Sequence, residues 1–257
     1  MQIFDFNIHL PDLSSPSTVD DLAQTEKDIS LLDGAYRIRS LPNIKGVNIM
    51  IFNQDFGEHC ELRNILSNKF ENFSITQLID PTTRSYNYQS IDCIKFHCYH
   101  QNITQKDYPN ILKLCKQASG AGKSICLDTS YGGSKMYKNN PMELACHIAD
   151  EIKNTPIILL HSGGLKCWEA FLLSTSQDNI FLETSFTVDY YWGSPLINDL
   201  KFIYHKLGAD RIIFGSDMPY ADHAKQVKQI RQLLNDIKFT DRDIEKIFYN
   251  NALTLLS

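Results

Sequence analysis

Residues 93–129 read CIKFHCYHQNITQKDYPNILKLCKQASGAGKSICLDT, and their pattern indicates how the chain folds. Its two ends, Cys93–His100 and Ser124–Thr129, are short apolar runs typical of buried strands. Between them, the segment Tyr108–Ser119 places its apolar residues on one stripe of a helix: Ile111, Leu112, Leu114, Cys115 and Ala118. A strand, a helix and a second strand in this order predict two parallel strands joined by a crossover helix.

The same alternation runs through the whole chain. Six further apolar runs are predicted strands: Gln2–Leu10, Gly46–Asn53, Phe73–Asp80, Ile157–His161, Asn179–Ser185 and Arg211–Asp217. Helical periodicity recurs in Met142–Ile152, Trp168–Leu173 and Val227–Ile237. Helix-boundary signals agree with this pattern: Pro141 in a first turn, Gly208 after a last turn, and Thr240 as a cap three residues before Asp243.

Eight strands alternating with helices predict an α/β fold, a single (β/α)8 TIM barrel. A doubly wound parallel sheet is the alternative. The interval Pro81–Asp92 is too short for a full helix, and we expect only a turn or two there.

Composition limits the class of protein. The chain has 257 residues, with 43% hydrophobic, 21% charged and a net charge of -5, which suits one barrel domain over residues 1–257. It has no basic stripe for nucleic acid, no apolar run near the ~18 residues of a membrane helix, and no basic start typical of a signal peptide. Seven scattered cysteines without a C-x-x-C pair indicate buried, reduced thiols. We therefore expect a cytoplasmic protein, and a homo-oligomer is plausible because most oligomers consist of identical chains.

Polar residues end five of the predicted strands, where barrel enzymes place their chemistry. On the first strand, the period of two puts Asp5, Asn7 and His9 on one face. Four later strands end in these residues: Lys95 and His97, Asp128, His161, and Asp217. A single such residue is more often part of a capped turn, but five equivalent positions favour a functional site. Histidines and carboxylates that converge on one rim are typical of a metal site.

The segments that carry these residues resemble the amidohydrolase-related family of metal-dependent hydrolases. They are IFDFNIHL, IKFHCYHQ, IILLHSGG, NIFLETSF, RIIFGSDMPY and NNALTLL. The resemblance covers nearly the whole chain in the family's order, and GSDMP with HSGG is its most specific combination. It implies a TIM barrel that acts as a hydrolase, lactonase or decarboxylase, usually with one divalent metal.

The resemblance implies roles for four residues. His9 matches the second metal ligand of the first strand, and Asp217 matches the strand-eight aspartate that binds metal and takes a proton from water. His161 matches the histidine that orients or protonates substrate and water. His97 matches a pocket histidine found in many relatives.

Two positions depart from the family pattern. Where relatives have His-x-His, the chain has Asn7-Ile8-His9, and the usual strand-five histidine aligns with Asp128. Oxygen ligands weaken a zinc site and favour harder ions such as manganese or magnesium. His9, Asp217, Asp128 and Asn7 could still hold one divalent metal such as zinc, manganese or iron. Alternatively the site is metal-free, as in lactonases that resemble this family.

We expect hydrolysis of a small ester, lactone or amide at this rim. Asp217 would be the general base, while His161 and His97 would polarise the carbonyl or bind substrate.

Three loops would close the mouth of the barrel: Leu10–Thr18, Tyr131–Asn140 and Phe186–Ser194. Aromatic residues in the last two, among them Tyr131 and Trp192, would either wall a substrate pocket or form an oligomer contact.

Two other functions remain open. A decarboxylase would use a cation from Lys95, Lys135 or Lys138, although Lys95 could simply pair with Asp5. A barrel that has lost catalysis would bind a ligand or a protein. Of the other histidines, His100 has the opposite parity to His97 and is expected to face the helices or a loop, while His223 could reach the rim.

Overall fold

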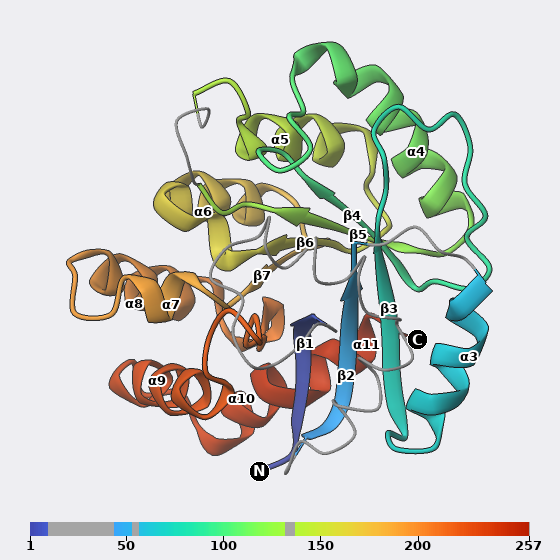
Figure 1. Cartoon of the computed structure of the whole chain (residues 1–257). Helices are drawn as coiled ribbons and strands as arrows, with labels where there is room; N and C mark the ends of the chain where they lie inside the picture. Colours follow the sequence, from blue (N-terminus) through green and yellow to red (C-terminus); the bar gives the residue numbers. More distant parts are fainter. Residues whose placement is uncertain (10–43, 53–56, 132–136, 257) are drawn as a thin grey trace.

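The computed structural model describes residues 1–9, 44–52, 57–131 and 137–256 of the chain (Figure 1). Eight parallel strands follow one another around one sheet in sequence order. They are β1 (Ile3–His9), β2 (Ile44–Ile51), β3 (Asn72–Leu78), β4 (Cys93–His97), β5 (Ser124–Asp128), β6 (Ile157–Leu160), β7 (Ile180–Glu183) and β8 (Ile212–Ile213). All eight predicted strands are confirmed, and the fold is a TIM barrel with helices between the strands.

Helices cover the outside of the barrel (Figure 1). Those described are α3 (Gly57–Ser67), α4 (Tyr108–Gly120), α5 (Pro141–Glu151), α6 (Cys167–Ser176), α7 (Thr187–Tyr190), α8 (Leu196–Leu207), α9 (His223–Asp236), α10 (Asp241–Glu245) and α11 (Asn251–Thr254). The predicted boundary signals are present: Pro141 opens α5, Gly208 ends α8, and Thr240 forms a capping box with Asp243. The interval Pro81–Asp92 contains turns but no helical turn.

Three backbone hydrogen bonds join the two edges of the sheet. The N–H of Phe6 donates to the carbonyl of Phe214 at 3.0 Å, and the N–H of His9 donates to that of Met218 at 2.8 Å. In the opposite direction, the N–H of Asp217 donates to the carbonyl of Asn7 at 2.8 Å. The segment after β8 therefore lies against β1, which brings the first and last strands of the chain to the same rim.

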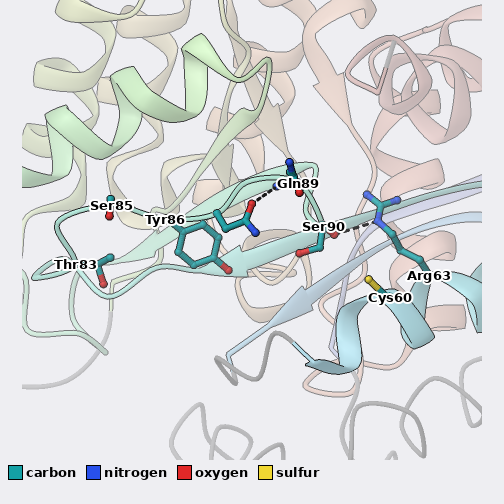
Figure 2. Close-up of a pocket in the computed structure, with 8 residues that line it drawn as sticks. Cys60, Arg63, Thr83, Ser85, Tyr86, Gln89 and Ser90 are labelled. Atoms are coloured by element: carbon teal, nitrogen blue, oxygen red, sulfur yellow. Dashed lines mark hydrogen bonds between the residues drawn. The ribbon is translucent and has the colours of Figure 1, made fainter.

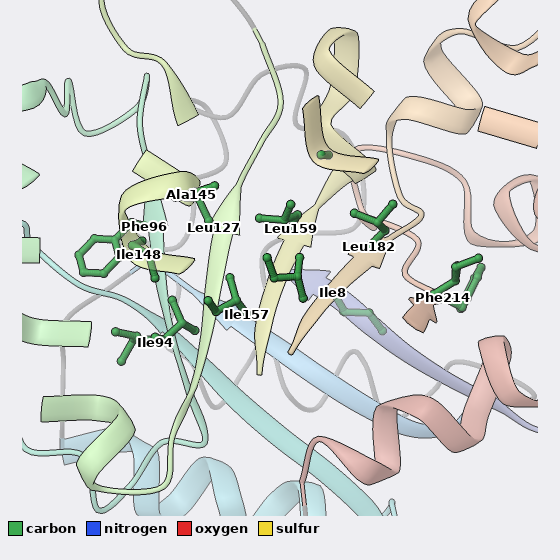
Figure 3. Close-up of a cluster of buried hydrophobic side chains, with 14 of the residues drawn as sticks. Ile8, Ile94, Phe96, Leu127, Ala145, Ile148, Ile157, Leu159, Leu182 and Phe214 are labelled. Carbon is green, nitrogen blue, oxygen red and sulfur yellow. The ribbon is translucent and has the colours of Figure 1, made fainter. Parts of the chain in front are cut away.

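Two hydrophobic layers hold the barrel. The outer layer lies between strands and helices, and Figure 3 shows some of its members: Ile94, Phe96 and Leu159 of the strands and Ile148 of α5. The inner layer fills the barrel with the alternate side chains: Phe4, Phe6, Met50, Cys93, Cys126, Ile158, Leu160 and Ile213. Strand residues in both layers are almost completely buried, as expected of a parallel sheet covered on both faces.

All seven cysteines are free thiols, five of them buried, as the sequence predicts. Among the described helices, none is long and apolar enough to cross a membrane. The predicted loop Leu10–Thr18 lies outside the described residues, as do Lys135 and part of Tyr131–Asn140. The predicted loop Phe186–Ser194 contains the short helix α7.

We predict that Gly46→Ala destabilises the barrel. Gly46 of β2 lies opposite Phe4 of β1, and a Cβ at Gly46 would lie 2.3 Å from a ring carbon of Phe4. Overpacking of this kind lowers the free energy of unfolding by about 1–3 kcal/mol, which urea denaturation would measure. Gly120→Ala is the matched control, because a Cβ added at Gly120 would meet no atom within 4 Å. Equal stability of the two variants would contradict the described packing of Phe4.

Candidate active site

A buried carboxylate, Asp128, is the centre of the candidate site. It is the last residue of β5 and is 3% exposed. Its Oδ2 lies 3.2 Å from Nζ of Lys95, 3.2 Å from Nε2 of His161 and 3.5 Å from Nε2 of His97. Its Oδ1 accepts hydrogen bonds from the N–H and the hydroxyl of Ser130. Because β4, β5 and β6 are neighbours in register, their ends deliver all three basic groups to one oxygen.

Burial and charge act in opposite directions on these groups. Burial acts to raise the pKa of Asp128, but the basic groups of His97, His161 and Lys95 outweigh it and hold that pKa well below its usual range. Burial would lower the pKa of His161, yet the charge and hydrogen bond of Asp128 raise it to about 9. For His97, burial dominates and lowers the pKa to about 3. At neutral pH, the site therefore holds an Asp128 carboxylate beside a His161 imidazolium and a neutral His97.

His161 lies in a left-handed turn directly after β6. Its φ is +66°, and φ at Ser162 is +50°, a region that residues with side chains rarely adopt. The next residue, Gly163, has φ +86°, and a Cβ there would lie 2.7 Å from the Cβ of Ala170. The hydroxyl of Thr187 donates to the carbonyl of His161 at 2.6 Å. The HSGG segment thus directs the imidazole across the rim to Asp128.

Ser185, just beyond β7, links His161 to Asn7. Its Oγ lies 2.7 Å from Oε2 of Glu183, 3.0 Å from Nδ1 of His161 and 3.0 Å from Nδ2 of Asn7. Glu183 accepts hydrogen bonds here, since it also receives the N–H groups of Ser185 and His161. The single hydroxyl hydrogen goes to Glu183, so Asn7 and His161 both donate to the Ser185 oxygen. Both ring nitrogens of His161 then act as donors, which matches its imidazolium state.

Asp217 and His9 form a second buried pair. Asp217 follows β8 with φ +60°, and its Oδ1 lies 3.5 Å from Nε2 of His9 at the end of β1. They are 6% and 1% exposed. The Asp217 charge also contributes to the raised pKa of His161, so the two clusters share one electrostatic environment.

Aromatic rings flank these histidines. The ring centroid of Phe52 lies 5.0 Å from that of His9, 6.4 Å from that of His97 and 5.5 Å from that of His100, on which it stacks. The ring centroid of Tyr220 lies 5.4 Å from that of His9. His100 was expected to face the helices or a loop, and it contacts the segment that follows β2. Because β4 ends at His97, the parity of the strand no longer applies at His100.

The prediction that Asp5 shares a face with Asn7 and His9 is wrong. Its neighbours Phe4 and Phe6 both belong to the inner layer, so Asp5 faces the opposite way. The pairing of β1 with β2 shifts by one residue between positions 5 and 8, and this irregularity restores the inward direction for Asn7 and His9. No sequence signal marks the shift.

Asp5 makes a separate set of contacts. Its Oδ1 accepts the N–H of Ser216 at 2.8 Å, and its Oδ2 lies 3.5 Å from Nε2 of His223. His223 thus contacts β1 through Asp5. The suggested pair of Lys95 with Asp5 does not form, because the Lys95 ammonium contacts Asp128.

The contacts of Tyr131 and Trp192 lie with residues other than the histidines and carboxylates of the two clusters. The Tyr131 hydroxyl donates to Oδ1 of Asn140 at 2.8 Å, and Nζ of Lys166 lies 5.4 Å from its ring centroid. Trp192 is partly buried and packs against the outer hydrophobic layer. Their role in substrate binding stays a prediction.

The four predicted metal ligands do not form one set. Asp128 contacts the Lys95 ammonium, Asp217 pairs with His9, and Asn7 donates its amide to a serine. Across the described parts of the chain, no group of three His, Cys, Asp or Glu side chains is arranged to hold a metal ion. An ammonium and an imidazolium already neutralise Asp128, so a divalent ion would meet repulsion there. These residues, as arranged, do not fit the metal that the family resemblance implies.

A separate pocket lies outside the barrel, beside the segment that replaces a helix between β3 and β4 (Figure 2). Its volume is about 530 Å³, and none of the predicted site residues lines it. Arg63 of α3 donates to the carbonyl of Ser90 and to both carboxylate oxygens of Asp92 there. Arg63 is the charged side chain among the described lining residues, and Asp92 neutralises it. The described lining therefore has no acid–base pair like those at the rim.

Sequence reasoning missed Glu183 and Ser185. Both lie at the end of the predicted strand Asn179–Ser185, within NIFLETSF. The strand-end rule that pointed to Asp128 could have identified them. Hydroxyl side chains are common in turns, however, and they make this strand end look ordinary.

Comparisons with known proteins agree with this architecture. Residues 138–257, which include His161 and Asp217, match the amidohydrolase family model. No curated protein matches the chain.

Several solved structures are similar over the full length. An uncharacterized TIM-barrel protein from Bordetella bronchiseptica is 14% identical with a TM-score of 0.70, and the match covers 100% of this chain and 98% of that one. A probable 2-pyrone-4,6-dicarboxylic acid hydrolase from Acinetobacter baumannii, with citric acid bound, is 15% identical with a TM-score of 0.63 over 100% and 99%. An amidohydrolase from Burkholderia multivorans with bound zinc is 7% identical with a TM-score of 0.65 over 100% and 99%. At these identities, the likeness shows the shared fold.

We predict that Asp128→Asn strongly destabilises the protein. The change leaves Lys95 and His161 buried without their counter-charge, which lowers the free energy of unfolding by about 3–5 kcal/mol in urea denaturation. Asp150→Asn is the control, since its side chain is 87% exposed and pairs only with Lys153. It should change stability by less than about 0.5 kcal/mol. If both variants match the wild type, the charge cluster does not hold the fold.

Stability should also depend on the raised pKa of His161. Its folded pKa of about 9 exceeds the value of about 6.5 in an unfolded chain, so its contribution is complete below pH 6.5 and is lost as pH rises through 9. Because of His161, the free energy of unfolding from urea denaturation should be about 3 kcal/mol lower at pH 10 than at pH 6. In His161→Asn, where asparagine tolerates the left-handed backbone, this part of the pH dependence should disappear. An identical slope in both proteins would refute the assignment.

Proposed function

We propose that the chain is an enzyme of the amidohydrolase superfamily and that it hydrolyses a small ester, lactone or amide. Residues 138–257 match the amidohydrolase family model, and the chain folds as a barrel like solved amidohydrolases. The observation that carries this proposal is the buried Asp217–His9 pair beside the His161 imidazolium. A carboxylate that can take a proton and a cation that can stabilise an oxyanion are the two groups that acyl hydrolysis needs.

The proposed reaction has two steps. Asp217 accepts a proton from water while the water oxygen bonds to the acyl carbon, and His9 keeps the carboxylate oriented. Negative charge that develops on the carbonyl oxygen is stabilised by His161, which Asp128 and Ser185 hold in its charged form. When the bond to the leaving oxygen or nitrogen breaks, that atom takes from Asp217 the proton that Asp217 accepted from water.

His97 and the adjacent rings would bind substrate. His97 is neutral at pH 7, and its Nδ1 has no hydrogen-bond partner among the described residues. This nitrogen can accept a hydrogen bond from a substrate N–H or O–H group. Phe52 and Tyr220 supply apolar surface beside the histidines.

No step of this mechanism is assigned to a metal, because the arrangement of Asp128 and Lys95 does not fit one. A decarboxylase would need a cation free to hold a substrate carboxylate. Lys95 contacts Asp128, so its ammonium is not free for that role. The Acinetobacter relative is named for hydrolysis of a 2-pyrone, which is a cyclic ester, and lactones are therefore the first substrates to test.

Asp217→Asn should lower kcat by about 100- to 10,000-fold, the usual contribution of a general base. A panel of lactones, esters and amides, each with and without added metal, would first identify a substrate. Asp150→Asn, on an exposed helix end, should keep full activity. Full activity in a correctly folded Asp217→Asn would exclude its role as base. A wild-type protein that stays folded but hydrolyses no member of the panel would exclude the proposed function.

A further inference from the structure

Lys95 places a buried ammonium at the centre of the candidate site. Lys95 is 2% exposed, and its Nζ lies 3.2 Å from Oδ2 of Asp128. Nζ also lies 5.2 Å from the ring centroid of Phe52, whose negative face attracts a cation. Burying a lysine without a partner would cost free energy of folding, so the contact with Asp128 stabilises the buried ammonium.

The same carboxylate oxygen faces two imidazoles. Nε2 of His161 lies 3.2 Å from Oδ2 of Asp128, and Nε2 of His97 lies 3.5 Å from it. Two imidazoles and one carboxylate on neighbouring strand ends form a donor set that zinc and related ions use. In this chain, the cation that reaches that donor set is an amino group.

We infer that the Lys95 ammonium takes the place of a divalent metal at the Asp128, His97 and His161 side chains, and that Lys95 excludes metal from this rim. The inference deepens the proposed function, because it supplies the positive charge that a metal-free hydrolase needs to keep Asp128 ionised. It rests on the proposed function only in assuming that the site is used for hydrolysis. Its test measures metal binding and needs no substrate.

Exclusion follows from charge and space. A divalent ion bound to Asp128 would lie within a few ångströms of the ammonium, where like charges repel strongly in a buried site. The ion would also need lone pairs from His97 and His161, whereas Nε2 of His161 donates to Asp128 in the present arrangement.

Lys95 has little freedom to leave. Its backbone lies inside β4, paired with Leu78 of β3 and Cys126 of β5. The residue is fully enclosed, with Asp128 at its tip and Phe52 alongside. The chain therefore carries its cation at a fixed position, whereas a metal would exchange with solvent.

The test is metal binding by a variant without the ammonium. Lys95→Met keeps an unbranched side chain, one atom shorter, and removes the charge. In a cobalt(II) titration followed by visible absorption, Lys95→Met should bind one equivalent at least about 100-fold more tightly than the wild type, as expected when a buried like charge is removed. Lys95→Met/Asp128→Asn should lose this binding, because the carboxylate ligand is gone.

Two results would overturn the inference. One is a folded Lys95→Met that binds cobalt no better than the wild type. The other is a wild-type protein that shows tetrahedral cobalt absorption, when an Asp128→Asn protein that circular dichroism shows to be folded lacks it. This result requires no lysine variant to fold. If Lys95→Met does not fold, Lys95→Gln replaces it in the first comparison. A hydrolase panel without activity would leave these binding results intact, so the two proposals fail separately.

Discussion

Burying a carboxylate in a barrel costs several kcal/mol unless other groups replace the water around it. Asp128 meets that requirement with an ammonium from β4, an imidazolium from the end of β6 and two hydrogen bonds from the residue that follows it closely in sequence. The partners come from three consecutive strands. The barrel must therefore hold β4, β5 and β6 in register before the charges can compensate one another.

The remaining parts of the site depend on His161. Its charge is stabilised by Asp128 on one side, and Ser185 accepts its second N–H on the other. Ser185 in turn fixes the amide of Asn7 on β1, while Asp217 reaches His9 because the chain after β8 pairs with β1. One connected set of contacts thus runs from the middle strands to the closure of the barrel.

The sequence was sufficient for the fold because each strand is an apolar run with a clear boundary. It also placed Asp128, His161, His97, His9 and Asp217 at the rim, because strand ends of a parallel barrel converge. Three features could not be predicted. The register shift in β1 turns Asp5 away, the end of β4 frees His100 from strand parity, and the partner of Lys95 depends on which layer its long side chain reaches.

Replacement of metal ligands by Asn7 and Asp128 suggested a weakened metal site, and the structure gives those residues other partners. The most direct test is a crystal structure of the wild-type protein grown with zinc, with diffraction recorded at the zinc absorption edge. We expect Nζ of Lys95 in contact with the Asp128 carboxylate and no anomalous peak between Asp128, His97 and His161. A zinc peak bound by these three side chains, with Lys95 displaced, would contradict a site organised around its own ammonium.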